Sequence, residues 1–290
     1  MKKRGLAAAF LLAVSFAGIS QSEETSTLSD TSRVVAIGGS ITEIIYALGA
    51  QDRLVARDST SVYPEAAFKL PDVGYMRQLS PEGVLSVNPS GIIALQTSGP
   101  KEAVDVLKKA SVPYVEVPET FDHKGIIDKI EIVGAALGEK EKADTLAKQV
   151  DSELNAAEAI TRNVTERKRV LFVLSLQGGK ILAAGSDTAA DGMIHLAGAE
   201  NAMQGLSGYK QMTDEAVVSA KPDAILVMDR AGQSISDDQV LQHPAIATTP
   251  AGEAKKIVRM DGSYLLGFGP RTASAVRELA TALYGETVGN

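Results

Sequence analysis

The chain has 290 residues, 44% of them hydrophobic, with a formal net charge of −7 and no cysteine. The lack of cysteine excludes disulfides, thiolate metal ligands and thiol nucleophiles, and also the lipid-anchored form of a bacterial export signal, which needs a cysteine at its cleavage site. The acidic balance excludes a basic surface for nucleic acid, so we expect no nucleic-acid partner.

The N-terminus has the three-part layout of a secretory signal peptide. Three cations at positions 2–4 precede an apolar run at 6–17, and small residues follow as far as Ser20. The apolar run is shorter than the roughly 20 residues that span a bilayer, which disfavours a transmembrane anchor. We therefore predict a signal peptide at residues 1–20, a flexible polar segment at 21–32, and export of the mature chain to the periplasm.

Strands and helices alternate from Arg33 onward. A β-branched run at 34–37 is followed by two glycines and then by Ser40 and Glu43 at capping-box spacing, which predicts a strand, a tight turn and a capped helix. Such alternation is typical of a mainly parallel sheet. Further strands are expected at 53–56, 91–96, 113–117, 170–176 and 224–228, and further helices at 101–110, 188–196 and 272–284.

Residues 124–164 contain no proline and have apolar residues at helical spacing. Gly134 and Gly138 interrupt this pattern, which leaves one bent helix and two helices in series as alternatives. A mature chain of about 270 residues exceeds the usual size of one domain, so we predict two Rossmann-like α/β lobes with a ligand cleft between them. The predicted divisions are an N-terminal lobe at 33–123, a long connecting helix at 124–165 and a C-terminal lobe at 166–290.

One short segment occurs twice, and each copy is expected to form a loop, a short helix and a strand. Residues 74–82 resemble residues 208–215, with Met76 as a one-residue insertion. Solenoids need at least three such units, whereas two distant copies fit two similar lobes. Beyond the insertion the match pairs Ser80 with Thr213, Glu82 with Glu215, Val84 with Val217, Ser86 with Ser219, Pro89 with Pro222 and Ile92 with Ile225.

The repeated loops place Tyr75 and Tyr209 at related positions, one in each lobe. Ligands of open α/β sheets bind outside the carboxyl ends of the strands, so both tyrosines are candidates for ligand contact. Tyr75 has Arg77 two residues away: a phenolate suits ferric haem iron, and a guanidinium favours the ionised phenol and matches the haem propionates. A solvated surface loop is the alternative for Tyr75 and Arg77, and simple packing is the alternative for Tyr209.

Glu82 and Glu215 stand in the first turns of two helices, behind probable caps at Ser80 and Thr213. A glutamate there is favourable simply because it meets the positive end of the helix dipole. Their equivalence in the two lobes favours a second role, in which two symmetric acids dock on a two-fold transporter dimer. Both interpretations stay open from these residues alone.

The sequence shows no convincing catalytic or metal-ligating set. His123, His195 and His243 are not spaced as ligands of one metal ion. There is no Gly-x-Ser-x-Gly elbow, residues 38–40 are too short for a phosphate loop, and residues 267–271 are typical of a plain turn before a helix. We therefore expect a binding protein and not an enzyme.

The chain resembles a known family, the periplasmic haem-binding proteins of bacterial haem ABC importers. The resemblance runs from Arg33 to about Tyr284, and its first segment is shared with siderophore and cobalamin binders. The Gly-Tyr-Met-Arg-Gln sequence at 74–78 is more particular to haem. The segments that carry the resemblance are 33–43, 73–79, 184–191 and 265–272.

The resemblance implies two α/β lobes joined by one long backbone helix, with haem as the transported ligand between them. It implies that Tyr75 is the axial ligand to the haem iron and that Arg77 is the basic residue beside it. Some relatives add a second axial ligand from the other lobe or hold two stacked haems; because no histidine here can be placed in that role, we expect one haem on Tyr75. It further implies that Glu82 and Glu215 dock on arginines of the permease dimer in the inner membrane, and that an outer-membrane haem receptor system acts upstream. Because a rigid helix limits closure, we predict only a small rearrangement on binding.

Three rival functions remain. The same scaffold could bind a ferric siderophore or cobalamin, although such ligands often lie on aromatic walls and this chain is only 4% aromatic, without tryptophan. A zinc or manganese binder lacks a recognisable ligand set. A two-lobed α/β enzyme would need an acid, base or nucleophile in its cleft.

Overall fold

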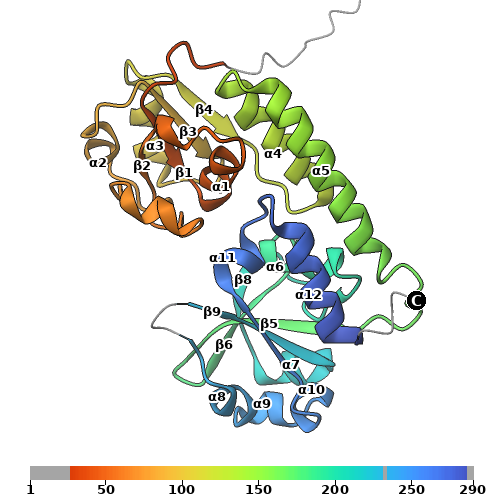
Figure 1. Cartoon of the computed structure of the whole chain (residues 1–290). Coiled ribbons are helices and arrows are strands. Elements are labelled where there is room, and N and C mark those ends of the chain that lie inside the picture. The colour runs from red at the N-terminus through yellow and green to blue at the C-terminus, as the bar shows by residue number, and fades with distance from the viewer. Residues whose placement is uncertain (1–26, 231–233, 286–290) are drawn as a thin grey trace, which may run out of the picture.

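The computed structural model describes residues 27–230 and 234–285, which form two α/β lobes flanked on one side by a pair of helices (Figure 1). The N-terminal lobe holds a four-stranded sheet in the order β2-β1-β3-β4, and every pairing in it is parallel. Its central strands β1 and β3 are buried throughout, as expected for apolar runs covered on both faces. The strands are β1 (Val34–Ile37), β2 (Leu54–Arg57), β3 (Gly91–Leu95) and β4 (Tyr114–Val117), and the helices are α1 (Gly39–Ala47), α2 (Pro81–Leu85) and α3 (Lys101–Lys109), with 3-10 turns at Gln51–Arg53 and Glu65–Lys69.

The C-terminal lobe has a mixed sheet in the order β10-β9-β5-β6-β8, with β7 paired to β5. Strands β5, β9 and β10 are parallel, whereas β6 is antiparallel to both β5 and β8. The antiparallel part arises because Gly178 and Gly179 both have positive φ and close a tight hairpin, which the expectation of a mainly parallel sheet missed. The strands are β5 (Arg169–Gln177), β6 (Lys180–Ala184), β7 (Glu200–Asn201), β8 (Tyr209–Met212), β9 (Ala224–Asp229) and β10 (Ile257–Asp261).

Helices cover both faces of the C-terminal sheet, and each face packs into its own hydrophobic cluster. Phe172 and Leu226 belong to a cluster that continues through the N-terminal lobe, whereas Leu171 and Ile225 face the short helices α7 to α10. One apolar core therefore runs across both lobes. The helices are α6 (Ala189–Leu196), α7 (Asp214–Ala220), α8 (Asp237–Leu241), α9 (Pro244–Ala247), α10 (Pro250–Glu253), α11 (Gly262–Leu266) and α12 (Thr272–Tyr284).

The connecting segment forms two helices that fold back on each other, α4 (His123–Ala136) and α5 (Lys140–Ala159). Of the two alternatives, two helices in series is therefore confirmed, and one bent or single long helix is wrong. Gly138 has φ 71° and reverses the chain, and a Cβ on Gly134 would lie 2.1 Å from that of Ala143, so the close packing requires this glycine. Helix α5 packs on α12 as well as on α4 and, at about 30 Å for its length, runs beside both lobes (Figure 1).

The segment before β1 is anchored from Leu28 onward. The Leu28 side chain is buried, and its N–H donates to the Ala136 carbonyl at 3.0 Å. Residues 27–32, expected to be flexible, are therefore held against the N-terminal lobe. The predicted signal peptide at 1–20 and residues 21–26 lie outside the described residues. Within the described ranges, no helix has both the length and the apolar character needed to cross a membrane.

Helix α1 begins at Gly39 without the predicted capping box. Its N-cap is Gly38, with φ 120° and no side chain to offer. Glu43 instead accepts a hydrogen bond from the Arg271 N–H at 3.0 Å, in the other lobe. A tertiary contact has replaced the local one.

The internal repeat is visible in the structure. Gly74 and Gly208 both have positive φ, and each copy continues into a capped short helix, α2 or α7, and then into a buried strand, β3 or β9. Paired positions share their burial: Val84 and Val217, like Ile92 and Ile225, are fully buried. The copies differ at the tyrosine, because Tyr209 opens strand β8 and does not lie in a loop.

Candidate functional site

Tyr75 and Arg77 project from a loop that backbone bonds hold at the carboxyl end of strand β3. Gly99, in the loop after β3, donates its N–H to the Met76 carbonyl at 2.8 Å, and its own carbonyl accepts the Leu79 N–H at 2.8 Å. Met76 is buried, whereas Tyr75 and Arg77 on either side of it are exposed. The inserted Met76 therefore acts as an anchor that turns both neighbours outward.

The two exposed side chains meet at their polar ends. The Tyr75 side chain is 40% exposed, and the Arg77 Nη1 lies 3.5 Å from the Tyr75 hydroxyl. The phenol oxygen is thus open to a ligand, with a fixed positive charge beside it. This arrangement suits an anionic oxygen ligand for a hard cation.

The buried carboxylate of Asp58 supports this loop from below, and the sequence prediction missed it. It accepts hydrogen bonds from the Gly38 N–H at 3.0 Å, the Ser61 hydroxyl at 2.8 Å and the Thr60 hydroxyl at 2.7 Å. The neighbouring Ser59 N–H donates to the Gly74 carbonyl at 2.9 Å. Asp58 thereby ties the ends of β1 and β2 to the segment that carries Tyr75. In the sequence, the only sign of this role is a single acidic residue directly after a predicted strand.

Tyr209 lies across from this loop, in the C-terminal lobe. Its ring packs edge-on against Phe172 with centroids 6.3 Å apart, and its phenol lies by the start of α6, near Thr188 and the Ala190 N–H. Burial raises the pKa of the Tyr209 phenol, although these groups and the guanidinium of Arg77 oppose the shift. The effect of Arg77 on this pKa places the guanidinium within electrostatic range of the Tyr209 phenol, although the two residues belong to different lobes. Tyr209 is a neutral phenol there, in contrast to the role expected of Tyr75.

Glu82 and Glu215 are both exposed and lie in the first turns of α2 and α7. The Ser80 hydroxyl accepts the Gly83 N–H at 3.3 Å and the Thr213 hydroxyl accepts the Ala216 N–H at 3.2 Å, so the predicted caps are present. Neither glutamate forms an ion pair within residues 27–230 and 234–285. Each is available at an equivalent place on its lobe.

The three histidines have separate structural contacts. His123 contacts Glu158 and Asp151 of α5 at 2.8 and 3.0 Å. The His243 Nε2 donates to the Gly179 carbonyl, in the β5–β6 hairpin, at 3.0 Å. His195 is half-exposed and lies 3.6 Å from Asp191. Across the described ranges, no three His, Cys, Asp or Glu side chains are placed to hold a metal ion.

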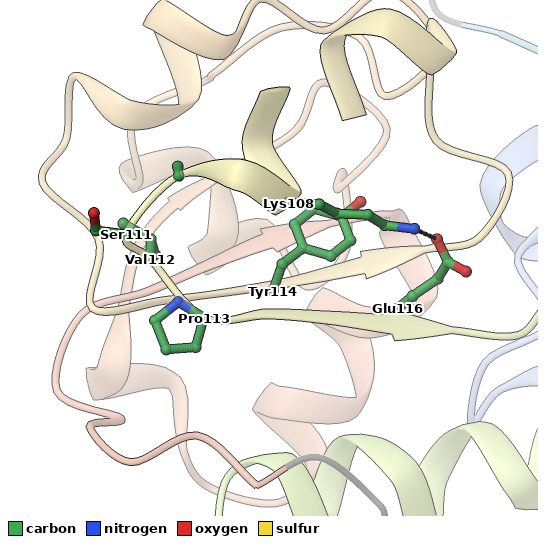
Figure 2. A pocket seen from close by; sticks show the side chains of 7 residues that line it. Lys108, Ser111, Val112, Pro113, Tyr114 and Glu116 are labelled. Carbon is green, nitrogen blue, oxygen red and sulfur yellow. Dashed lines mark hydrogen bonds and ion pairs between the residues drawn. The ribbon is translucent and has the colours of Figure 1, made fainter. Parts of the chain in front are cut away.

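Two surface cavities lie away from these residues. The larger, of about 570 Å³, is at the edge of β4, where Lys108 pairs with Glu116 at 2.6 Å and lies over the Tyr114 ring (Figure 2). The smaller, of about 440 Å³, lies between the end of α1 and α5. Neither is lined by residues of the Tyr75 loop. The Lys108 cation is already paired, so the larger cavity presents no unpaired charge from that residue.

Known proteins resemble this chain over most of its length. The structure of "Periplasmic heme-binding protein BhuT in complex with two hemes" is 40% identical, with a TM-score of 0.81, and the match covers 87% of this chain and 97% of that one. An uncharacterized ABC transporter substrate-binding lipoprotein, YvrC, of Bacillus subtilis is 28% identical over 91% of this chain and 84% of its own length. A vitamin B12-binding protein of Vibrio vulnificus is 25% identical, covering 85% of this chain and 88% of that protein.

These matches confirm the predicted scaffold of two α/β lobes and the predicted class, a solute-binding protein of ABC importers. A family model described as periplasmic binding protein matches residues 34–264, which span both lobes and the helices between them. The chain therefore belongs to the periplasmic binding protein family.

Proposed function

We propose that this protein captures haem between its lobes and delivers it to an ABC importer of the inner membrane. The observation that carries the proposal is the exposed Tyr75 hydroxyl with the Arg77 guanidinium 3.5 Å away. A phenolate is a hard ligand for ferric iron, and the guanidinium stabilises the negative charge on its oxygen. The 40% identity to a haem-binding protein supports the same ligand.

The two lobes have different parts in this proposal. Tyr75 supplies the oxygen ligand, and the Arg77 guanidinium, 3.5 Å from the Tyr75 hydroxyl, supplies a positive charge that suits a haem propionate. Tyr209, partly buried and packed against Phe172, offers an apolar ring edge and a hydroxyl from the opposite lobe. One haem on Tyr75 is the proposed load, and the two haems in the BhuT structure make stoichiometry a quantity to measure.

Titration of the purified apo-protein with ferric haem, followed by absorption, tests this directly. A saturable Soret band with a tyrosinate charge-transfer feature is expected, and Tyr75→Phe should remove the charge-transfer feature and weaken binding. Tyr46→Phe is the control, because it also removes one phenol hydroxyl. Tyr46 lies on α1, outside the Tyr75 loop, and burial raises the pKa of its phenol, which disfavours the phenolate that iron would need. A Tyr75→Phe protein with an unchanged spectrum would exclude Tyr75 as the ligand.

Cobalamin is a second candidate because of the similarity to a vitamin B12-binding protein. The same titration with cyanocobalamin distinguishes the two ligands: saturable binding of cobalamin without a saturable haem spectrum would replace haem in the proposal. A ferric siderophore is tested in the same way. We also propose that the protein is a carrier and not an enzyme, so bound haem should be recovered unchanged after incubation.

Glu82 and Glu215 are proposed to dock on the permease. Their exposure, their lack of ion-pair partners among the described residues and their equivalent places on α2 and α7 support this role. The double variant Glu82→Ala and Glu215→Ala should bind haem as the wild type does but stimulate transport by the reconstituted importer far less. Glu102→Ala together with Glu253→Ala, two exposed acids on other helices, is the control. Equal transport by both double variants would exclude docking through Glu82 and Glu215.

Export to the periplasm with removal of residues 1–20 is proposed on the layout of the N-terminus. N-terminal sequencing of the protein recovered from the periplasmic fraction tests it. A first residue close to position 21 is expected, whereas a protein that begins at Met1 and stays in the cytoplasm would contradict export.

A further inference from the structure

A buried ion pair joins the two lobes where the segment before α12 meets α1. Arg271, from the C-terminal lobe, donates three hydrogen bonds or ion-pair contacts to the Glu43 carboxylate of the N-terminal lobe. Its backbone N–H lies 3.0 Å from Oε1, and its Nε and Nη2 both lie 2.9 Å from Oε2. The Glu43 side chain is only 10% exposed. Two residues separated by 228 positions therefore join the lobes through charge-assisted hydrogen bonds.

A second buried cation lies close to this pair. The Lys129 side chain, on α4, is fully buried, with its Nζ 3.3 Å from the Ser40 hydroxyl, 3.2 Å from the Phe268 carbonyl and 3.7 Å from the Glu119 carboxylate. Ser40 belongs to the N-terminal lobe and Phe268 to the C-terminal lobe. Lys129 therefore donates to both lobes from the helix between them.

Aromatic contacts and close backbone packing surround these charges. The Arg271 guanidinium lies 3.5 Å from the centre of the Tyr63 ring, and the rings of Phe121 and Phe268 meet edge-on at 5.2 Å. A Cβ on Gly269 would lie 3.2 Å from Glu43 Oε1, so the backbone of the C-terminal lobe approaches the carboxylate closely. The cluster is thus a packed interface and not a loose surface bridge.

The charges in this cluster depend on one another. Burial raises the pKa of Glu43, and Arg271 opposes the shift; burial lowers the pKa of Lys129, and Glu119 and Glu43 oppose it. A buried charge that loses its partner is far more costly than one that keeps it. Small displacements of one lobe against the other are therefore resisted, because they would leave several buried charges partly unpaired at once.

We propose that Glu43, Arg271 and Lys129 form an interlobe lock that sets the separation between the Tyr75 loop and Tyr209, which makes them positioning residues for the bound ligand. The lock itself is independent of the ligand's identity, and only its effect on haem affinity rests on the proposed function. The ion-pair partner of Arg271 lies in the other lobe, whereas those of Arg259 lie in its own: Arg259 pairs with Asp229 at 2.8 Å and with Asp237 at 2.6 Å. The two arginines are equally exposed, at 27% and 26%, so Arg259 is a matched control.

Distance measurement by pulsed electron paramagnetic resonance tests the lock without any ligand. The chain has no cysteine, so spin labels can be placed at Glu102→Cys on α3 and Glu253→Cys on α10, both exposed and one in each lobe. A narrow distance distribution is expected for the otherwise wild-type protein. Glu43→Gln and Arg271→Met should shift it to longer distances and broaden it, whereas Arg259→Met should leave it unchanged. Identical distributions in all four proteins would overturn the lock.

Haem titration of the same variants gives the second readout. Glu43→Gln and Arg271→Met should weaken affinity about tenfold, within the range typical of coupling between distant sites, and should retain the tyrosinate charge-transfer feature because Tyr75 is intact. Arg271→Lys, which keeps the charge but loses the bidentate geometry, should recover part of the affinity. If Arg271→Met does not fold, Glu43→Gln alone decides. A wild type that binds no haem would refute the proposed ligand while the distance measurement still tests the lock; unchanged haem affinity in Glu43→Gln would refute the positioning role.

Discussion

Gly192→Ala should destabilise the protein although it adds one methyl group inside a helix. Gly192 lies in α6, and a Cβ built on its backbone would be 2.1 Å from the Phe121 carbonyl oxygen and 2.6 Å from the Phe121 Cβ. The obstacle is backbone, and it is held in place because Asp122 caps α4 by accepting the Gly125 N–H at 2.7 Å. To relieve the overlap, α6 and residue 121 must separate by on the order of 1 Å, which is the kind of shift that overpacking imposes.

Two opposing effects set the magnitude of this change. Replacing glycine by alanine within a helix normally stabilises by about 1 kcal/mol, whereas overpacking a rigid site costs about 1–3 kcal/mol. Because the overlap is with main-chain atoms, we expect the cost to prevail, with a net loss of about 1–2 kcal/mol.

Urea unfolding followed by circular dichroism measures the effect, with Gly205→Ala as the control. A Cβ on Gly205 would meet no atom within 4 Å, so that variant should be neutral or slightly stabilised. A Gly192→Ala protein that unfolds at the same urea concentration as the wild type, or at a higher one, would refute the argument from close packing of α6 on residue 121.

Three further predictions concern single side chains. The Tyr114 hydroxyl is buried without a hydrogen-bond partner among the described residues, so Tyr114→Phe should raise the free energy of unfolding by about 1 kcal/mol. Burial also raises the pKa of Tyr114 to about 12, because it disfavours the ionised phenol. The free energy of unfolding should therefore fall as the pH rises from about 10 toward 12, and Tyr114→Phe should lack this fall; equal alkaline sensitivity of the two proteins would contradict it. Thr213→Ala removes the cap of α7 and should cost about 1 kcal/mol in urea unfolding, whereas Thr213→Asn should keep most of the stability. Phe268→Ala empties a fully buried site and should cost about 3–5 kcal/mol, whereas Phe68→Ala, at an exposed ring, should cost far less.

The N-terminal lobe could be predicted from the sequence because its signals are local. Strands β1 to β4 are short apolar runs bounded by turn residues, and the observed ends lie within one or two residues of the expected ones. The C-terminal lobe was harder, because β6 and β8 are partly exposed and pair antiparallel through a two-glycine hairpin. Strand β10 pairs with β9 across more than twenty intervening residues, so no neighbouring motif marks it.

The candidate site also contains some residues that local sequence predicts and others that only tertiary contacts reveal. Tyr75 and Arg77 are two positions apart, so their alternation around a buried Met76 was within reach of the sequence. Glu43 was not, because the spacing from Ser40 also fits a helix cap, and only the folded chain shows that its partner is Arg271. Asp58 and Lys129 stand beside other charged residues in the sequence, and only the folded chain shows that Asp58 accepts from the Gly38 N–H and that Lys129 pairs with Glu119.

The contrast between local and tertiary contacts bears on how this protein holds a ligand. The groups proposed to touch haem lie on two lobes. Backbone hydrogen bonds fix the Tyr75 loop relative to the N-terminal lobe but not relative to Tyr209 in the C-terminal lobe. The separation of Tyr75 from Tyr209 therefore depends on contacts that meet no ligand: the Glu43–Arg271 pair, the Lys129 contacts and the packing of α6 on residue 121. Substitutions at these positions should change ligand affinity while leaving the ligand's coordination unchanged, whereas substitution of Tyr75 should change both the coordination and the affinity.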